Sequence, residues 1–229
     1  MRSCILARAL VATCVALAAC GDDGMGPTGN NATVRFVNAT SVSLDIAEDG
    51  SVATGNGALS FGTASNCMSV LATNPELAVR QTGTSAPLAG FTPAFQAGGN
   101  YTVIAYPGAG GATQFATVSN AFTPSAGQAG LRVFNAVAPG TSYDVYAGAA
   151  GATTVTVGAN NVGYGSGSSY FNVAAGTAQQ VRITNAGTQT LVLDVGMRTF
   201  ILGQNVTLVL APPAPGSTTP RGFYATGCS

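Results

Sequence analysis

The chain has 229 residues, of which 46% are hydrophobic and only 7% are charged. Disordered chains show the reverse balance, so we expect a folded protein. Eight basic residues balance eight acidic ones, and the sequence holds no basic cluster of the kind that nucleic-acid binding needs. There is no histidine, which excludes histidine as a general base, a metal ligand or a pH switch.

The first twenty residues have the pattern of a secretory signal. Arg2 and Arg8 give a basic start, and residues 9–19 form an apolar run. That run is shorter than the roughly 20 residues that a membrane-spanning helix needs. Residues 17–20 (LAAC) resemble the lipobox of bacterial lipoproteins, which implies cleavage before Cys20 and a lipid on its side chain. The alternative is an ordinary signal that happens to end in cysteine.

The segment after the lipobox favours an exported, lipid-anchored protein. Gly21 stands where lipoproteins retained in the inner membrane carry aspartate, so the resemblance implies the outer membrane rather than the inner one. Residues 21–31 (GDDGMGPTGNN) are rich in glycine and polar side chains, which is typical of a flexible tether. A multiply acylated Cys20 would anchor the chain stably, because stable anchoring needs more than one acyl chain.

An internal repeat sets the domain organisation. Residues 34–39 (VRFVNA) return as residues 131–136 (LRVFNA), and further matches follow in the same order at an offset that drifts from 97 to 105. We therefore expect a signal peptide over 1–20, a tether over 21–31, and two copies of one domain over 32–125 and 126–229. The other matching pairs are Leu44–Ile46 with Tyr143–Val145, Ser60–Gly62 with Gly163–Gly165, Val79–Arg80 with Val181–Arg182, and Asn100–Val103 with Asn205–Leu208.

Each copy has the pattern of an all-β domain. Short runs rich in Val, Ile, Thr, Tyr and Phe alternate apolar and polar residues between clusters of Gly, Pro, Asn and Ser. Residues 33–37, 179–184, 190–195 and 206–211 are the clearest examples. Few windows are long enough, and free enough of Gly and Pro, to show a helical period. The regular spacing of the strands predicts two Ig-like β-sandwiches in tandem.

The motifs of the repeat resemble a bacterial envelope family. The Val-Arg-x-x-Asn-Ala opening, residues 143–146 (YDVY) and the later Gly-x-x-Tyr-Thr-Val strand are similar to tandem DUF4397 lipoproteins, a family known as a domain of unknown function. The first copy departs from the pattern, with Leu44–Ile46 followed by Ala47 where a second tyrosine is expected. The resemblance implies a fold and a location, and it implies no activity.

Cys67 and Cys228 remain once Cys20 is assigned to the lipid. Exported proteins lie in compartments where disulfides persist, so we expect a bond between the two. It would tie the C-terminal tail of the second domain to the first. The alternatives are a buried free Cys67 with an exposed Cys228, or pairing with another chain.

Charged residues recur in both copies of a chain that is poor in charge: Arg35 with Arg132, and Asp45 with Asp144. Arg80 and Arg182 also recur, and we expect them to be strand residues that point outward. One interpretation is a hydrogen-bonded pair or turn contact inside each domain. The other is a contact with a ligand or partner that the protein uses twice. We expect the structural role.

The residues that carry catalysis or metal binding elsewhere form no convincing site here. Asp45, Glu48 and Asp49 cluster before a glycine turn, which favours a solvated turn or a weak Ca²⁺ site over a glycosidase pair. The serines lack both a histidine base and a Gly-x-Ser-x-Gly elbow. Six tyrosines could line a sugar-binding face, although a core role is commoner for strand residues. They are Tyr101, Tyr106, Tyr143, Tyr146, Tyr164 and Tyr170.

The sequence therefore predicts a non-enzymatic lipoprotein of the cell envelope, without a cofactor or metal, whose domains act as an interaction or spacer module. Its expected partners are the membrane, through the lipid, and another envelope protein or a polysaccharide. A module that binds envelope glycans or other ligands is the alternative, and a hydrolase is the remote one.

Overall fold

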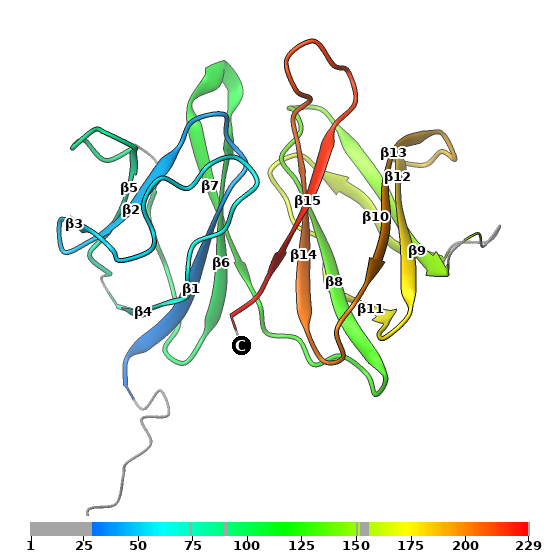
Figure 1. The fold of residues 1–229 in the computed structure, drawn as a ribbon, viewed down its shortest axis with the longest axis horizontal. Coiled ribbons are helices and arrows are strands. Elements are labelled where there is room, and N and C mark those ends of the chain that lie inside the picture. Colours follow the sequence, from blue (N-terminus) through cyan, green and yellow to red (C-terminus); the bar gives the residue numbers. More distant parts are fainter. Residues whose placement is uncertain (1–28, 74, 89–90, 150, 152–155, 229) are drawn as a thin grey trace, which may run out of the picture.

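The chain folds into two β-sandwiches that lie side by side (Figure 1). The computed structural model describes residues 29–73, 75–88, 91–149, 151 and 156–228. Cys20 and the proposed signal and tether up to residue 28 lie outside these residues. Within the described part, no helix has the length and hydropathy that crossing a bilayer requires.

The first repeat packs a four-stranded sheet against a three-stranded one. The sheets have the strand orders β4-β1-β6-β7 and β3-β2-β5. Val34, Ile46 and Val103 are among the buried side chains that form the core between them. The strands are β1 (Asn31–Asn38), β2 (Leu44–Glu48), β3 (Ser51–Val52), β4 (Met68–Leu71), β5 (Leu77–Gln81), β6 (Asn100–Pro107) and β7 (Thr113–Ser119), with a single-turn helix η1 (Ala109–Gly111) between the last two.

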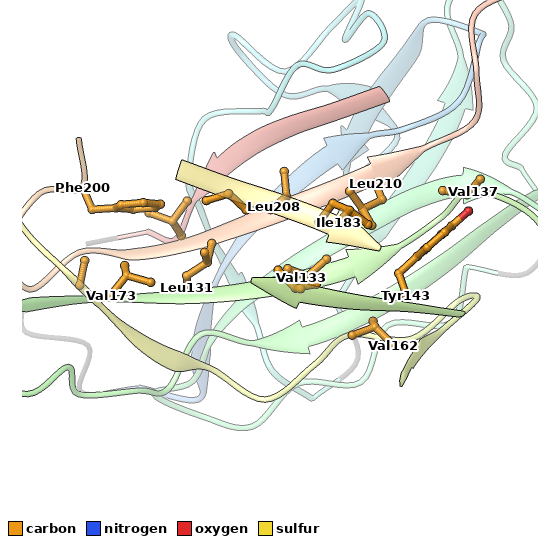
Figure 2. Close-up of a cluster of buried hydrophobic side chains, with 14 residues drawn as sticks. Leu131, Val133, Val137, Tyr143, Val162, Val173, Ile183, Phe200, Leu208 and Leu210 are labelled. Atoms are coloured by element: carbon orange, nitrogen blue, oxygen red, sulfur yellow. The ribbon is translucent and has the colours of Figure 1, made fainter. Parts of the chain in front are cut away.

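The second repeat packs two four-stranded sheets, of orders β11-β8-β14-β15 and β10-β9-β12-β13. Figure 2 shows its core, in which Leu131, Val133, Ile183 and Leu208 meet between the sheets. The strands are β8 (Gln128–Asn135), β9 (Ser142–Ala149), β10 (Thr156–Gly163), β11 (Phe171–Ala174), β12 (Ala178–Asn185), β13 (Leu191–Thr199), β14 (Asn205–Ala211) and β15 (Arg221–Thr226).

The two repeats share one strand topology, except that β13 of the second repeat has no counterpart among the described strands of the first. In the first, β1 pairs in parallel with β6, with Thr33 opposite Asn100, and in the second, β8 pairs in parallel with β14, with Gly130 opposite Asn205. The last strand of each repeat, β7 or β15, then pairs antiparallel with β6 or β14. Strands β1, β6, β8 and β14 all begin at the same end of the molecule (Figure 1), which we call the tether end because the chain enters β1 there.

The observed strands confirm the predicted all-β tandem fold. The expected strands at 33–37, 179–184 and 206–211 lie within β1, β12 and β14. Strand β4 alternates strictly between buried and exposed side chains, as a half-buried strand does. Strands β6 and β14 instead contain unbroken runs of buried residues, because both faces of their sheets are covered.

Candidate functional site

The two sandwiches pack against each other through an apolar contact, which we call the seam. Ile104 on β6 and Val209 on β14 are fully buried there. Each repeat contributes seven side chains, from equivalent positions, so the contact is isologous like that of a symmetric dimer. The side chains are Val37, Ala39, Phe61, Ile104, Tyr106, Ala116 and Val118 from the first repeat and Phe134, Ala136, Tyr164, Val209, Ala211, Phe223 and Ala225 from the second.

Aromatic side chains at equivalent positions close the seam. Phe61 packs edge-on against Phe223, with ring centroids 5.5 Å apart. Tyr164, the counterpart of Phe61, packs edge-on against Tyr106 at 5.6 Å, and its hydroxyl donates a hydrogen bond to the carbonyl of Pro107. Pairs of this geometry each add about 0.5–1.5 kcal/mol beyond the area they bury.

The recurrent arginines make reciprocal contacts across the seam. Arg35 on β1 donates through Nη1 to the carbonyl oxygen and the Oγ1 of Thr226, both at 2.7 Å. Arg132 on β8 donates through Nη1 to the carbonyl of Ser119. Ser119 and Thr226 occupy the same place at the ends of β7 and β15. Each arginine therefore fastens the last strand of the opposite repeat, and neither pairs with the recurrent aspartate of its own domain.

The two arginines differ in how fully their nitrogens are used. Arg132 is 3% exposed, and it also donates through Nε to Thr207 Oγ1 at 2.9 Å and through Nη2 to Asn120 Oδ1 at 2.6 Å. Burial lowers the pKa of Arg132, and the nearby Tyr170 partly offsets this effect. Arg35 is less buried, and its Nε has no hydrogen-bond partner among the described residues.

Cys67 and Cys228 form the predicted disulfide, with their Cα atoms 5.9 Å apart. The bond links the first repeat to the segment after β15, so it closes over the seam. Tyr170 stands at the equivalent position in the second repeat, where it stacks on Phe122 of the segment after β7, with ring centroids 5.1 Å apart and planes inclined by 18°. The guanidinium of Arg132 lies 4.6 Å from the centre of the Tyr170 ring.

A small pocket of about 220 Å³ opens at the seam beside Arg35. Asn120, Asn205, Thr226 and Cys228 are among the residues that line it. Oδ1 of Asn205 is buried without a hydrogen-bond partner among the described residues, whereas its Nδ2 donates to the carbonyls of Asn120 and Phe122. The pocket therefore presents one cation and several amide groups.

The recurrent aspartates are buried and support loops inside their own repeats. Asp45 Oδ1 accepts the N–H of Ala58 at 2.7 Å, and Asp144 Oδ1 accepts the N–H of Asn161 at 2.7 Å. Ala58 and Asn161 have φ values of 51° and 47°, a left-handed conformation that is costly for a residue with a side chain. Each carboxylate thus holds an equivalent strained turn inside its own repeat. The expectation of a contact inside each domain is wrong for Arg35 and Arg132, which make hydrogen bonds across the seam.

The sequence model of a protein family described as Domain of unknown function (DUF4397) matches the chain over residues 32–139 and again over 129–223. The chain belongs to this family. The two matches confirm the tandem resemblance that the motifs indicated. No curated protein matches the chain significantly.

Each DUF4397 repeat also contains a buried asparagine that the sequence analysis did not single out. Asn38 and Asn135 are fully buried, and their Nδ2 groups donate to the carbonyls of Leu59 at 2.7 Å and Val162 at 3.0 Å. Both asparagines belong to the first repeated motif. Their recurrence beside the arginines was the available signal for this shared loop support.

Apart from the buried Asp45, the acidic residues of the first DUF4397 repeat lie in an open groove. Glu48, Asp49 and Glu76 line it, with a volume of about 540 Å³, near Asn31 at the tether end. A hydrogen bond with Asp49, and then its negative charge, raise the pKa of Glu76. Among the described residues, no group of three His, Cys, Asp or Glu side chains is placed to hold a metal ion.

The tyrosines do not form an open aromatic face. Tyr106, Tyr143 and Tyr146 are buried, and the other four are partly buried in the packing of strands and loops. Sugar binding by stacking needs rings that are open to solvent on one face. The positions of the tyrosines therefore count against the stacking surface that the sequence left as an alternative.

Proposed function

We propose that this DUF4397 protein is a non-enzymatic lipoprotein of the bacterial cell envelope whose two repeats act as one rigid interaction or spacer module. The observation that carries the proposal is the isologous seam, which the Cys67–Cys228 disulfide fastens. Two domains that were free to move would present a variable surface, whereas a docked pair presents its loops in fixed positions relative to one another.

The disulfide also supports export. Disulfides persist in oxidising compartments and are rare in the bacterial cytoplasm. The lipobox at residues 17–20 supplies the export route and the anchor, and Gly21 favours the outer membrane. The tether after Cys20 would then connect the folded pair to the lipid.

The roles of the recurrent polar residues support a module without catalysis. Arg132 uses all three of its guanidinium nitrogens in hydrogen bonds across and beside the seam. Asp45 and Asp144 hold turns, and Asn38 and Asn135 hold loops. Arg132 and the recurrent aspartates and asparagines are therefore engaged in building the fold.

A ligand-binding module is the second candidate, and the pocket beside Arg35 is the observation that favours it. Domain interfaces are common places for small-molecule sites, and this pocket is lined by the cation of Arg35 and by several amide side chains. Its volume of about 220 Å³ fits only a small ligand or one end of a larger one.

The anchor can be tested by fractionating cells that express the Cys20→Ser variant. We expect this variant to leave the membrane fraction, because it has lost the acylated side chain. Cys14→Ser, which changes a cysteine inside the apolar run of the same signal, is the matched control and should stay membrane-bound. Membrane retention of Cys20→Ser equal to that of Cys14→Ser would refute the anchor.

The module role can be tested by crosslinking the tagged protein in cells and identifying what is attached by mass spectrometry. One dominant protein partner supports the interaction role, and no enrichment over an unrelated lipoprotein supports the spacer role. Crosslinks confined to polysaccharide or to a small ligand would replace both with the ligand-binding candidate.

A further inference from the structure

Two large apolar side chains project together from the turn between β13 and β14. Ile201 and Leu202 are 64% and 65% exposed, the highest values among the large hydrophobic residues described as exposed. The turn is well defined: the N–H of Gln204 donates to the carbonyl of Ile201 at 3.1 Å, and the N–H of Gly203 donates to that of Gln128 at 2.9 Å. Both side chains are therefore held in solvent by a fixed backbone.

The equivalent turn of the first repeat shows that the backbone does not require apolar side chains there. The N–H of Gly99 donates to the carbonyl of Gln96 at 2.9 Å, and Gly98 has the same φ of 73° as Gly203. Gln96 and Ala97 thus stand where the second repeat has Ile201 and Leu202. Because the same turn forms without them, the exposed pair calls for an explanation outside the fold.

The turn lies at the tether end of the molecule. It leads directly into β14, which begins at the same end as β1 (Figure 1). The contacts of the neighbouring strands agree, because Asn100 at the start of β6 donates to the carbonyl of Cys228, and Asn205 at the start of β14 donates to that of Asn120. Ile201 and Leu202 therefore face the side from which the chain leaves toward Cys20.

The tether is short enough to keep that end close to a lipid surface. Ten residues, 21–30, separate Cys20 from the start of β1. A flexible Gly-rich segment of this length has a root-mean-square span of about 17 Å. A lipid on Cys20 would thus hold the tether end near the bilayer at a high local concentration, where even a weak apolar contact forms.

We propose that the Ile201–Leu202 turn contacts the bilayer when the chain is anchored through Cys20, and so orients the docked pair on the membrane. This inference rests on the lipid anchor proposed above. Moving the exposed side chains of Ile201 and Leu202 out of water lowers the free energy. Residues 199–204 (TFILGQ) carry no charge that would oppose entry into the headgroup layer. Glu48, Asp49 and Glu76 at the same end favour neutral over anionic lipids.

The absence of tryptophan from the chain allows a direct test. The variant Leu202→Trp carries one reporter at the turn, and Ala97→Trp carries it at the matched turn of the first repeat. Thr218→Trp, in the exposed loop between β14 and β15, reports from the opposite end. The chain from Cys20 onward, with its disulfide intact, is coupled through the Cys20 thiol to a maleimide phospholipid in phosphatidylcholine vesicles with or without brominated acyl chains.

We expect the emission of Leu202→Trp to shift to shorter wavelength on the vesicles and to be lost on brominated lipid. The emission of Ala97→Trp and Thr218→Trp should change much less. Ile201→Trp repeats the measurement in case Leu202→Trp folds poorly. The proposal is overturned if Leu202→Trp and Ile201→Trp each emit equally on plain and on brominated lipid. It is also overturned if brominated lipid quenches Ala97→Trp as strongly as Leu202→Trp. A turn that docks on a protein instead gives the first of these results.

The synthetic anchor keeps this test separate from the proposed function. If Cys20 is not lipidated in cells, the fractionation experiment will contradict the proposed anchor. The vesicle experiment will still report whether the turn enters lipid, because the lipid is attached to Cys20 chemically. Failure of the vesicle experiment, with Cys20→Ser released from cell membranes, would remove the turn contact and leave the anchor in place.

Discussion

Cys67 and Tyr170 stand at equivalent positions of the two repeats, and each fixes the chain segment that follows the last strand of the other repeat. Cys67 does so with a disulfide to Cys228, and Tyr170 by stacking on Phe122. The isologous seam is thus fastened covalently on one side and by packing on the other. This asymmetry leads to separate expectations for the two sides.

The double variant Cys67→Ser, Cys228→Ser should be less stable but still docked. The bond spans 161 residues, and closing such a loop stabilises a protein by about 5 kcal/mol in the chain-entropy model. Urea unfolding should show a loss of about 2–5 kcal/mol. Small-angle scattering should show an unchanged radius of gyration, because the apolar seam remains. An expanded particle would mean that the disulfide, and not the packing, holds the repeats together.

Arg132→Met should cost more stability than Arg35→Met. Removing Arg132 leaves Asn120 and Thr207 without a charged donor in a buried place, and the carbonyl of Ser119 without one in a part-buried place. The cost is about 1.5–3 kcal/mol for each hydrogen bond that water cannot replace. Arg35 is closer to solvent, so we expect a loss of about 1 kcal/mol. The measurement is the free energy of unfolding in urea for both variants, and equal losses would contradict the asymmetry.

Asp144→Asn should be more harmful than Asp45→Asn. Asp144 accepts backbone N–H groups on both oxygens, from Asn161 at 2.7 Å and Gly187 at 2.8 Å, so an amide NH₂ must face one of these donors. Both hydrogen bonds that Asp45 accepts from described residues go to Oδ1, which leaves room for the NH₂ group at Oδ2. Thermal unfolding should show a loss of about 1–3 kcal/mol for Asp144→Asn and clearly less for Asp45→Asn. The reverse order would contradict these roles.

Tyr224→Phe should make the protein more resistant to alkaline unfolding. Burial raises the pKa of Tyr224 to about 12 from its usual 10.0. Because the folded pKa is the higher one, the stabilisation is complete below pH 10 and is lost as the pH rises from 10 to 12. The phenylalanine variant has no proton to lose there, and at neutral pH it should be no less stable, since the hydroxyl has no partner among the described residues.

The comparison for Tyr224 is made by urea unfolding near pH 8 and near pH 11.5. The wild type should lose about 2 kcal/mol more than Tyr224→Phe between these two conditions. The other tyrosines titrate alike in both proteins and cancel in the difference. Parallel losses in the two proteins would mean that Tyr224 ionises without disturbing the fold.

The repeats and strands were predictable because each rests on local sequence. The matches around Arg35 and Arg132 place the two copies in register, and the alternation of residues 33–37 places β1. The pairing of Cys67 with Cys228 was predictable because the proposed lipid site leaves just these two cysteines after the signal.

The seam was not predicted, because the partners of its residues lie far along the chain. Arg35 reaches Thr226 across 191 positions, and nothing near Arg35 indicates that contact. A signal was nevertheless present in residues 103–106 (VIAY) and 208–211 (LVLA), whose unbroken apolar runs are typical of strands covered on both faces. The apolar pair at Ile201 and Leu202 needed the structure as well, because sequence alone does not place a turn at one end of a molecule.

The central claim is that the two repeats form one rigid body, and residual dipolar couplings test it most directly. Backbone N–H couplings are measured for the chain from residue 21 onward in a weakly aligning medium. We predict that couplings from β6 and β14, and from the other strands of both repeats, fit a single alignment tensor in the orientation of the structure. A separate tensor for each repeat would show that they move independently, and it would contradict the account of a docked module.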